Sequence, residues 1–382
     1  MASKSKVALF LYIIINEIFI YKYGLRQSYL SVYLSIVLYP LVILGLLFLL
    51  KKAAHFLNNL KNFNKLFILF GVAVSLIILL IILSVDKNEL NTDRWSAMTV
   101  AIKTLLNLEY PYTAIDHLGG RSSNLPGLLL IGIPFYLMGN VGLLQLFVFL
   151  VSFYFLIKSK ITNVKKIAIV FLLVLSPAYM WEVYVASDLM SNFIIILLFM
   201  IYWDNRFNSN YMKRPLLLGF ALSILILTRG VVVIPLLIFL FHHFYTNKIA
   251  SKLKLITTLF IGIGLLILPI ILLAPNTETL LNYNPLELQT RQTSQSFQVI
   301  IIMLSLLVSF KAKNIIQVFQ WSFITLSILL VVTMIGYFFK YGIYQSIVES
   351  IFDISYLGIL IPFAILTIVL NNPSNEKRSL LV

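Results

Sequence analysis

Hydrophobic residues along this chain come in long, uninterrupted runs that are separated by short polar segments. Runs such as Leu66–Leu83 and Leu253–Ala274 are long enough, with their flanks, to cross the hydrocarbon of a bilayer as helices. The pattern therefore predicts an all-α, polytopic membrane protein with about twelve transmembrane helices (11–13). The predicted spans are 7–21, 29–50, 66–85, 141–157, 167–181, 188–203, 215–228, 230–246, 255–274, 298–310, 317–339 and 351–370.

Composition agrees with this pattern, since 60% of the residues are hydrophobic and only 11% are charged. A soluble domain cannot hide that much apolar surface, so residues 1–382 are interpreted as a single transmembrane domain. The chain has no cysteine, which excludes disulfides and thiolate metal sites, and its four histidines lack the spacing of metal ligands. We therefore expect no metal site and no cofactor.

The net charge of +15 is unevenly distributed between the two sides of the predicted membrane domain. Alternating the spans places 20 of the 29 lysines and arginines on one side with two acids, and nine basic residues with eleven acids on the other. The positive-inside rule then puts both termini in the cytoplasm and the acidic loops outside the cytoplasmic membrane. The basic excess follows the topology and predicts membrane lipid, not nucleic acid, as the partner.

Residues 125–138 look apolar enough to cross but are short and interrupted by Pro126 and Pro134. Counting them as a crossing would move the basic segment 158–166 to the outside. We therefore expect them to form a re-entrant or juxtamembrane helix on the external face.

The largest polar segment, 86–124, is external in this topology. Within it, 92–108 is predicted to be an amphipathic helix that lies flat at the membrane interface, so that 86–138 forms an external loop with amphipathic and re-entrant helices. Its apolar face would carry Trp95, Met98, Ile102, Leu105 and Leu106, and its polar face Ser96, Thr99, Lys103 and Asn107.

Ionisable residues from several separate hairpins gather on this external side. Such groups at helix ends are functional candidates in a membrane protein, and together they would supply a general base and cations for an anionic leaving group. They are Asp86, Glu89, Asp93, Arg94, Lys103, Glu109, Asp116, His117 and Arg121, followed by Glu182, Asp188, Arg229, Glu287 and Arg291.

Several short motifs follow one another in order along residues 86–246. They are Asp93-Arg-Trp-Ser-Ala-Met, Ala101-Ile-Lys-Thr-Leu-Leu, Glu109-Tyr-Pro-Tyr112, Asn124-Leu-Pro-Gly127, Ser176-Pro177, Asp188 at the start of a span, and Leu227-Thr-Arg-Gly230. This ordered set resembles the GT-C glycosyltransferases, in which an acidic residue precedes an amphipathic helix that closes on a Pro-Tyr pair. It is similar to the pattern in protein mannosyltransferases and lipid A aminoarabinose transferases. Residues 275–382 lie outside the resemblance.

The resemblance implies an integral membrane glycosyltransferase that moves a sugar from a polyprenyl-phosphate carrier to an extracytoplasmic acceptor. The family's catalytic carboxylate corresponds to Asp93, which would take the proton of the attacking hydroxyl. The leaving lipid phosphate needs cations, and the candidates are Arg229 and Arg291, then Arg94 and Arg121. Candidates for acceptor or substrate binding are Asp188, Glu182, Asp116 and Tyr112.

These residues also have structural interpretations. Asp93 stands where a helix begins and could be its N-cap, and Arg94 could simply pair with Asp93. Asp188 and Glu182 could cap the sixth span. Arg229 could close a tight turn.

Two other functions remain open from the sequence, a transporter or flippase of lipid-linked sugars and a polysaccharide polymerase or ligase. Transporters usually show internal repeats and charged or broken helices near the bilayer midplane. The acids here lie mostly at helix ends on one side, which favours the enzyme. We expect Asp93, Asp188 and Arg229 to border one external cavity.

The orientation can be tested by cysteine labelling, because the native chain has no cysteine. Thr162→Cys should be shielded from impermeant thiol reagents in intact cells, whereas Leu118→Cys should react. Labelling at 162 without labelling at 118 would reverse the orientation.

Overall fold

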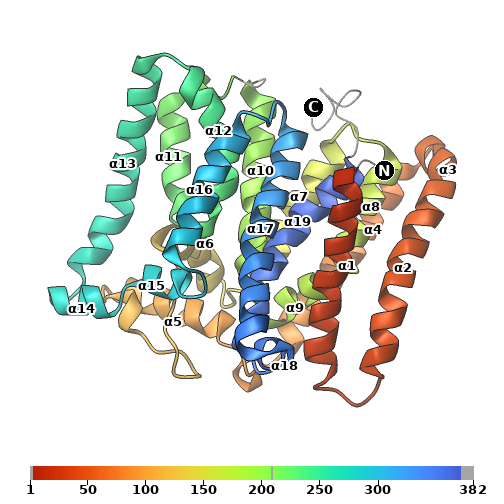
Figure 1. The fold of residues 1–382 in the computed structure, drawn as a ribbon, viewed down its shortest axis with the longest axis horizontal. Coiled ribbons are helices and arrows are strands. Elements are labelled where there is room, and N and C mark those ends of the chain that lie inside the picture. The colour runs from red at the N-terminus through yellow and green to blue at the C-terminus, as the bar shows by residue number, and fades with distance from the viewer. Residues whose placement is uncertain (1–2, 208–209, 371–382) are drawn as a thin grey trace.

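The computed structural model describes residues 3–207 and 210–370. Within these residues all regular structure is helical apart from one isolated bridge between Ile115 and Arg121, so the all-α prediction is confirmed. The longer helices run roughly side by side, and short helices cluster at the two ends of the bundle (Figure 1).

Five helices of the described chain are long and apolar enough to cross a membrane. Their surfaces face largely outward: in α2, for example, only Val32 and Ile43 are buried. Outward-facing leucine, isoleucine and phenylalanine are what lipid contact requires. The five are α1 (Ser3–Gly24), α2 (Val32–Lys52), α4 (Phe63–Ser84), α13 (Ile249–Leu272) and α17 (Ile315–Tyr341).

Two further candidates are bent pairs, which would raise the number of crossings to seven if each pair is one span. The first, α8 (Asn163–Val174) with α9 (Pro177–Val185), bends by 58°. Pro177 disfavours a helical conformation at Ser176, whose side chain instead accepts a hydrogen bond from the Tyr179 amide. The second pair joins α14 (Thr277–Asn282) and α15 (Pro285–Thr290) to α16 (Gln295–Ser309) with a bend of 61°.

The remaining helices are shorter or more polar. The apolar ones are α6 (Pro126–Leu137), α7 (Leu143–Lys158), α10 (Leu189–Phe207), α11 (Pro215–Ile226), η4 and α12 (Gly230–Val232, Val233–Thr246), and η5 and α19 (Ile354–Ile359, Leu360–Val369). The others are α3 (Ala54–Asn59), η1 (Lys87–Glu89), α5 (Arg94–Leu106), η2 (Pro111–Thr113), η3 (Tyr211–Lys213) and α18 (Ile343–Ile347).

These bounds differ from several of the predicted spans. By length and composition, five helices of the described chain could cross a membrane, or up to seven if each bent pair is one span, so twelve spans are not confirmed. The predicted span 167–181 is not one straight helix, because α8 and α9 meet at an angle. Several other apolar runs form helices of only 10–17 residues.

Contacts between distant segments define two ends of the bundle. At one, which we call the acidic end, Arg94 pairs with Asp353 and Arg121 donates to the Asn282 carbonyl. At the other, the basic end, Lys4 and Lys311 both lie over the ring of Trp321. Figure 1 shows α5, α9, α14, α15 and α18 at the acidic end and α3 at the opposite one.

Helix α6 begins and ends near the acidic end. Gly127, at its start, donates its backbone N–H to the Leu227 carbonyl at 2.8 Å, where α11 ends. Gly142, just beyond its end, lies against Ile82 near the end of α4 and Ala186 after α9. A side chain at Gly127 would meet the backbone of α11, so a glycine is needed for this close approach.

The predicted amphipathic helix 92–108 corresponds to α5. Its buried residues include Met98 and Ile102, which pack against Gly132 of α6. Ser96, expected on the polar face, is buried, and its hydroxyl forms a hydrogen bond with the His117 Nδ1 atom at 2.6 Å. The part of the apolar face around Met98 and Ile102 is therefore covered by α6, whereas Leu106, expected on the same face, is 43% exposed.

Candidate functional site

The acidic end contains a cavity of about 1170 Å³, which we call the large cavity. It lies where α1, α4 and α17 end, α5 begins and α9 crosses the bundle. Its volume is somewhat above the range of about 300–1,000 Å³ that is typical of small-molecule sites. The charged residues that line it are Lys22, Arg26, Asp93, Arg94, Arg291 and Asp353, giving four cations and two carboxylates.

Asp93 occupies the N-cap position of α5 but does not act as its cap. Its backbone is already helical (φ −87°, ψ −1°), and its side chain accepts no hydrogen bond from the helix. The side chain is 43% exposed, and its nearest charged partner is the Nε atom of Arg94 at 3.8 Å. The carboxylate thus keeps most of its hydrogen-bonding capacity for a molecule in the cavity.

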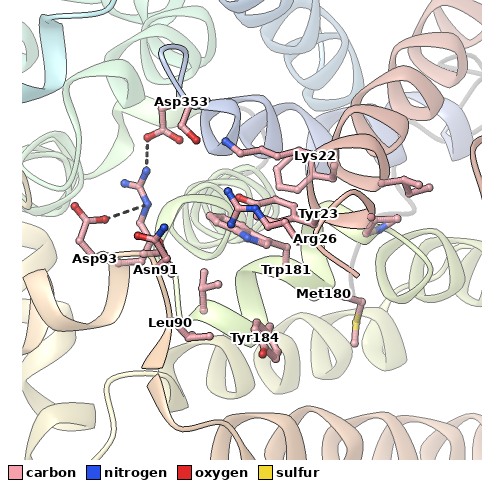
Figure 2. A pocket seen from close by; sticks show the side chains of 18 of the residues that line it. Lys22, Tyr23, Arg26, Leu90, Asn91, Asp93, Met180, Trp181, Tyr184 and Asp353 are labelled. Carbon is pink, nitrogen blue, oxygen red and sulfur yellow. Dashed lines mark hydrogen bonds and ion pairs between the residues drawn. The ribbon is translucent and has the colours of Figure 1, made fainter. Parts of the chain in front are cut away.

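Arg94 is held between two carboxylates. Its Nη2 atom forms a close ion pair with Asp353 and donates to the Ser355 hydroxyl at 3.1 Å, while its Nε atom faces Asp93. Figure 2 shows Asp93 and Asp353 together on one side of the cavity, with dashed lines marking these pairs.

The ion pair keeps both groups charged. Burial opposes the charge of Asp353, but the Arg94 guanidinium and the Ser355 hydroxyl and amide outweigh it and lower the pKa of the carboxyl. Burial likewise opposes the charge of Arg94, and the two carboxylates raise its pKa further above the usual range.

The opposite side of the cavity combines cations with aromatic rings. Tyr23 stacks on Trp181 with ring centroids 5.5 Å apart, and Arg26 lies 5.1 Å from the Tyr23 centroid. Lys22, Tyr23, Arg26, Trp181 and Tyr184 all border the space in front of Asp93 (Figure 2). This side offers positive charge and flat apolar faces together.

Asp188 and Arg229 do not line the large cavity, contrary to our expectation that they border it with Asp93. They form a buried ion pair in which Arg229 Nη2 and Nε lie 2.6 and 3.2 Å from one Asp188 oxygen. Arg229 also donates to Asn124 and Ser123, at 2.8 and 3.2 Å. Burial opposes its charge, but Asp188 outweighs burial and raises the pKa of Arg229.

The 3-10 helix η5 connects this buried pair with the large cavity. It packs against α10, which begins directly after Asp188, and its Ser355 hydroxyl accepts a hydrogen bond from Arg94, which lines the cavity.

Glu182 caps α10 from the neighbouring helix α9. Its two carboxylate oxygens accept the amide hydrogens of Met190 and Ser191 at 2.6 Å and the Ser191 hydroxyl at 2.7 Å. A carboxylate at a helix N-terminus satisfies unpaired amides and complements the helix dipole. These contacts therefore support the interpretation of Glu182 as a helix cap and not as a substrate-binding residue.

The other candidates lie at a second place on the acidic end. Asp116 is buried and accepts the amides of Leu118 and Gly120 at 2.8 and 3.0 Å, which fixes the turn before Arg121. Tyr112 and Arg121 line a separate cavity of about 70 Å³, where Arg121 lies over the Tyr283 ring. Of the predicted site residues, the structure brings together only Asp93, Arg94 and Arg291 in the large cavity.

Lys22, Arg26, Trp181 and Asp353 were missed by sequence reasoning. Lys22 and Arg26 are among the few basic residues on the predicted external side, and that exception to the positive-inside rule was the available signal. Asp353 pairs with Arg94 across 259 positions, a contact that no local pattern predicts.

Within residues 3–207 and 210–370, no three histidine, aspartate or glutamate side chains come together as metal ligands would. Comparisons with protein-family models, with curated proteins and with solved structures found no match for this chain.

The buried ion pair can be tested by removing one partner. Arg229→Ala leaves the Asp188 carboxylate buried without a counter-charge, so unfolding in detergent should be easier by about 3–5 kcal/mol. Replacing both partners by apolar residues, Arg229→Met with Asp188→Leu, should recover part of this loss.

Lys103→Ala is the matched control, because Lys103 is exposed on the nearby helix α5. It should change stability by less than about 0.5 kcal/mol. If Arg229→Ala were as stable as this control, the ion pair would not contribute to the stability of the fold.

Proposed function

We propose that this chain is a GT-C-like integral membrane glycosyltransferase that moves a sugar from a polyprenyl-phosphate carrier to an acceptor at the acidic end. The observation that supports it most is the large cavity. There the Asp93 carboxylate, which caps no helix, lines the same space as four cations and a stacked pair of aromatic rings. A base, a phosphate-binding surface and flat apolar faces are the parts such a transfer needs.

In the proposed reaction, Asp93 accepts the proton of the acceptor hydroxyl as its oxygen bonds to the anomeric carbon of the sugar. The bond between that carbon and the phosphate oxygen breaks, and the electron pair leaves with the lipid monophosphate. Lys22, Arg26 and Arg291 offset the charge of this leaving group. Arg94, bound by Asp353, positions the Asp93 carboxylate.

The basic residues that we assign to the leaving phosphate differ from those predicted from the sequence. Arg229 has most of its donors engaged with Asp188, Asn124 and Ser123, so binding a phosphate would require breaking that network. Arg121 lies at the small cavity. Arg291 keeps its predicted role because it lines the large cavity with Asp93.

We also propose that the chain crosses the membrane about twelve times, with α6 not crossing, both termini cytoplasmic and the acidic end external. Support comes from the position of both ends of α6 near the acidic end. Helices of 10–17 residues would then span a locally thinned bilayer.

Replacing the proposed base tests the enzyme reading. Asp93→Asn should fold normally, because the side chain caps nothing, yet polyprenyl-phosphate release from a sugar donor should fall about a hundredfold to ten-thousandfold. The measurement uses purified protein, polyprenyl-phosphate sugars and a crude acceptor fraction.

Glu89→Gln is the matched control, since Glu89 is exposed in the same loop and lines no part of the large cavity. It should release polyprenyl phosphate at the normal rate. Full activity of Asp93→Asn would rule out this residue as the base. If the native protein instead moved lipid-linked sugars across vesicles without releasing polyprenyl phosphate, a flippase would replace the enzyme. Joining of sugar units with release of lipid pyrophosphate would indicate a polymerase or ligase.

A further inference from the structure

A second polar cavity lies at the basic end, away from the proposed reaction. It has a volume of about 480 Å³ and sits where α10 ends and α11 and α13 begin. Helices α11 and α13 pack closely against each other at the edge of the bundle (Figure 1). We call it the basic-end cavity, and its lining residues are Tyr202, Arg206, Phe207, Lys213, Arg214, Pro215, Leu216, Leu217 and Lys254.

The charge of this cavity is uniformly positive. Of the described residues that line it, four are cations and none is acidic. Among the residues that the structure describes, no ion pair or side-chain hydrogen bond engages Arg206, Arg214 or Lys254, and the same holds for Lys213. The nearby Asp204 accepts a hydrogen bond from Tyr211 instead of lining the cavity. An anion in this space would offset the mutual repulsion of the cations.

The start of α11 adds to this positive potential. Its N-cap is Arg214, which forms no capping hydrogen bond, and Pro215 at the first helical position has no N–H. The amides of Leu216 and Leu217 therefore have no acceptor within the helix, and a cation stands where the helix dipole favours an anion. A phosphate group would satisfy both the amides and the cations.

The rim of the cavity is apolar and open to the outside of the bundle. Leu216 and Leu217 are 56% and 55% exposed, and Tyr202 is 51% exposed. Phe220, one turn further along α11, continues this apolar surface at 48% exposure. A molecule with an anionic head and hydrocarbon tails would fit both the cationic interior and the apolar rim, whereas a free phosphate would contact only the cationic interior.

We propose that the basic-end cavity binds the phosphate headgroup of an anionic phospholipid, with the acyl chains lying along the outer face of α11. The basic end is the cytoplasmic one under the positive-inside rule, and basic pockets between helices on that side suit anionic headgroups. This inference does not depend on the reaction proposed for the large cavity.

The experiment measures lipid binding to the purified full chain by native mass spectrometry and by its unfolding temperature in detergent. Phosphatidylglycerol should bind and raise the unfolding temperature, and phosphatidylcholine should not. Arg214→Gln with Lys254→Gln should weaken phosphatidylglycerol binding about thirtyfold, since each basic residue contributes roughly fivefold. Both side chains are exposed, so the variant should fold.

Lys61→Gln with Lys65→Gln is the matched control, because it removes two exposed charges from the same end but away from the cavity. It should bind phosphatidylglycerol like the native chain. Equal weakening in both double variants would show that binding follows net charge and would overturn the site. Stabilisation by inorganic phosphate alone, equal to that by the lipid, would overturn the lipid as its occupant.

Discussion

A charge in the apolar interior of a membrane helix bundle is tolerated only where an opposite charge or several hydrogen bonds meet it. This constraint organises the whole molecule. Arg229 lies buried only because Asp188, Asn124 and Ser123 surround its guanidinium. The contact joins the start of α10, the end of α11 and the segment before α6. It holds these three segments together, and α10 in turn packs against η5, whose Ser355 accepts a hydrogen bond from Arg94 at the large cavity.

The same constraint explains why Asp93 stands out. Glu182 and Asp188 are acids of the same end, but their oxygens are engaged by helix amides and by a guanidinium. Asp93 keeps a partly exposed carboxylate, and its one close charged partner among the described residues, Arg94, is shared with Asp353. A carboxylate held in place but not saturated is suited to exchange a proton with a substrate. The two ends of the bundle therefore differ: among the described residues, charges of both signs line the large cavity, whereas only cations line the basic-end cavity.

Sequence patterns predicted the helices whose apolar residues follow a regular local spacing. The amphipathic segment 92–108 matches α5, and long apolar runs such as 255–274 match membrane-length helices such as α13. The break at Ser176-Pro177 was visible as a motif, yet hydropathy alone joined its two sides into one span. Helix length and composition by themselves support fewer crossings than the twelve predicted, because several apolar runs form helices of only 10–17 residues.

The site was predicted only in part, since its geometry depends on contacts between distant segments. Asp93 and Arg94 were found from their place before α5, but the partner Asp353 lies 259 residues away from Arg94. Nothing in the sequence separated Arg229, which is buried in an ion pair, from Arg291, which faces the large cavity.

The most direct measurement is photo-crosslinking of the native protein with a short polyprenyl-phosphate sugar that carries a photoreactive group near its phosphate. The account predicts saturable labelling of peptides that contain Lys22, Arg26 or Asp93, and competition by unlabelled donor. Saturable labelling confined to peptides that contain no residue lining the large cavity, or labelling that unlabelled donor does not reduce, would contradict it.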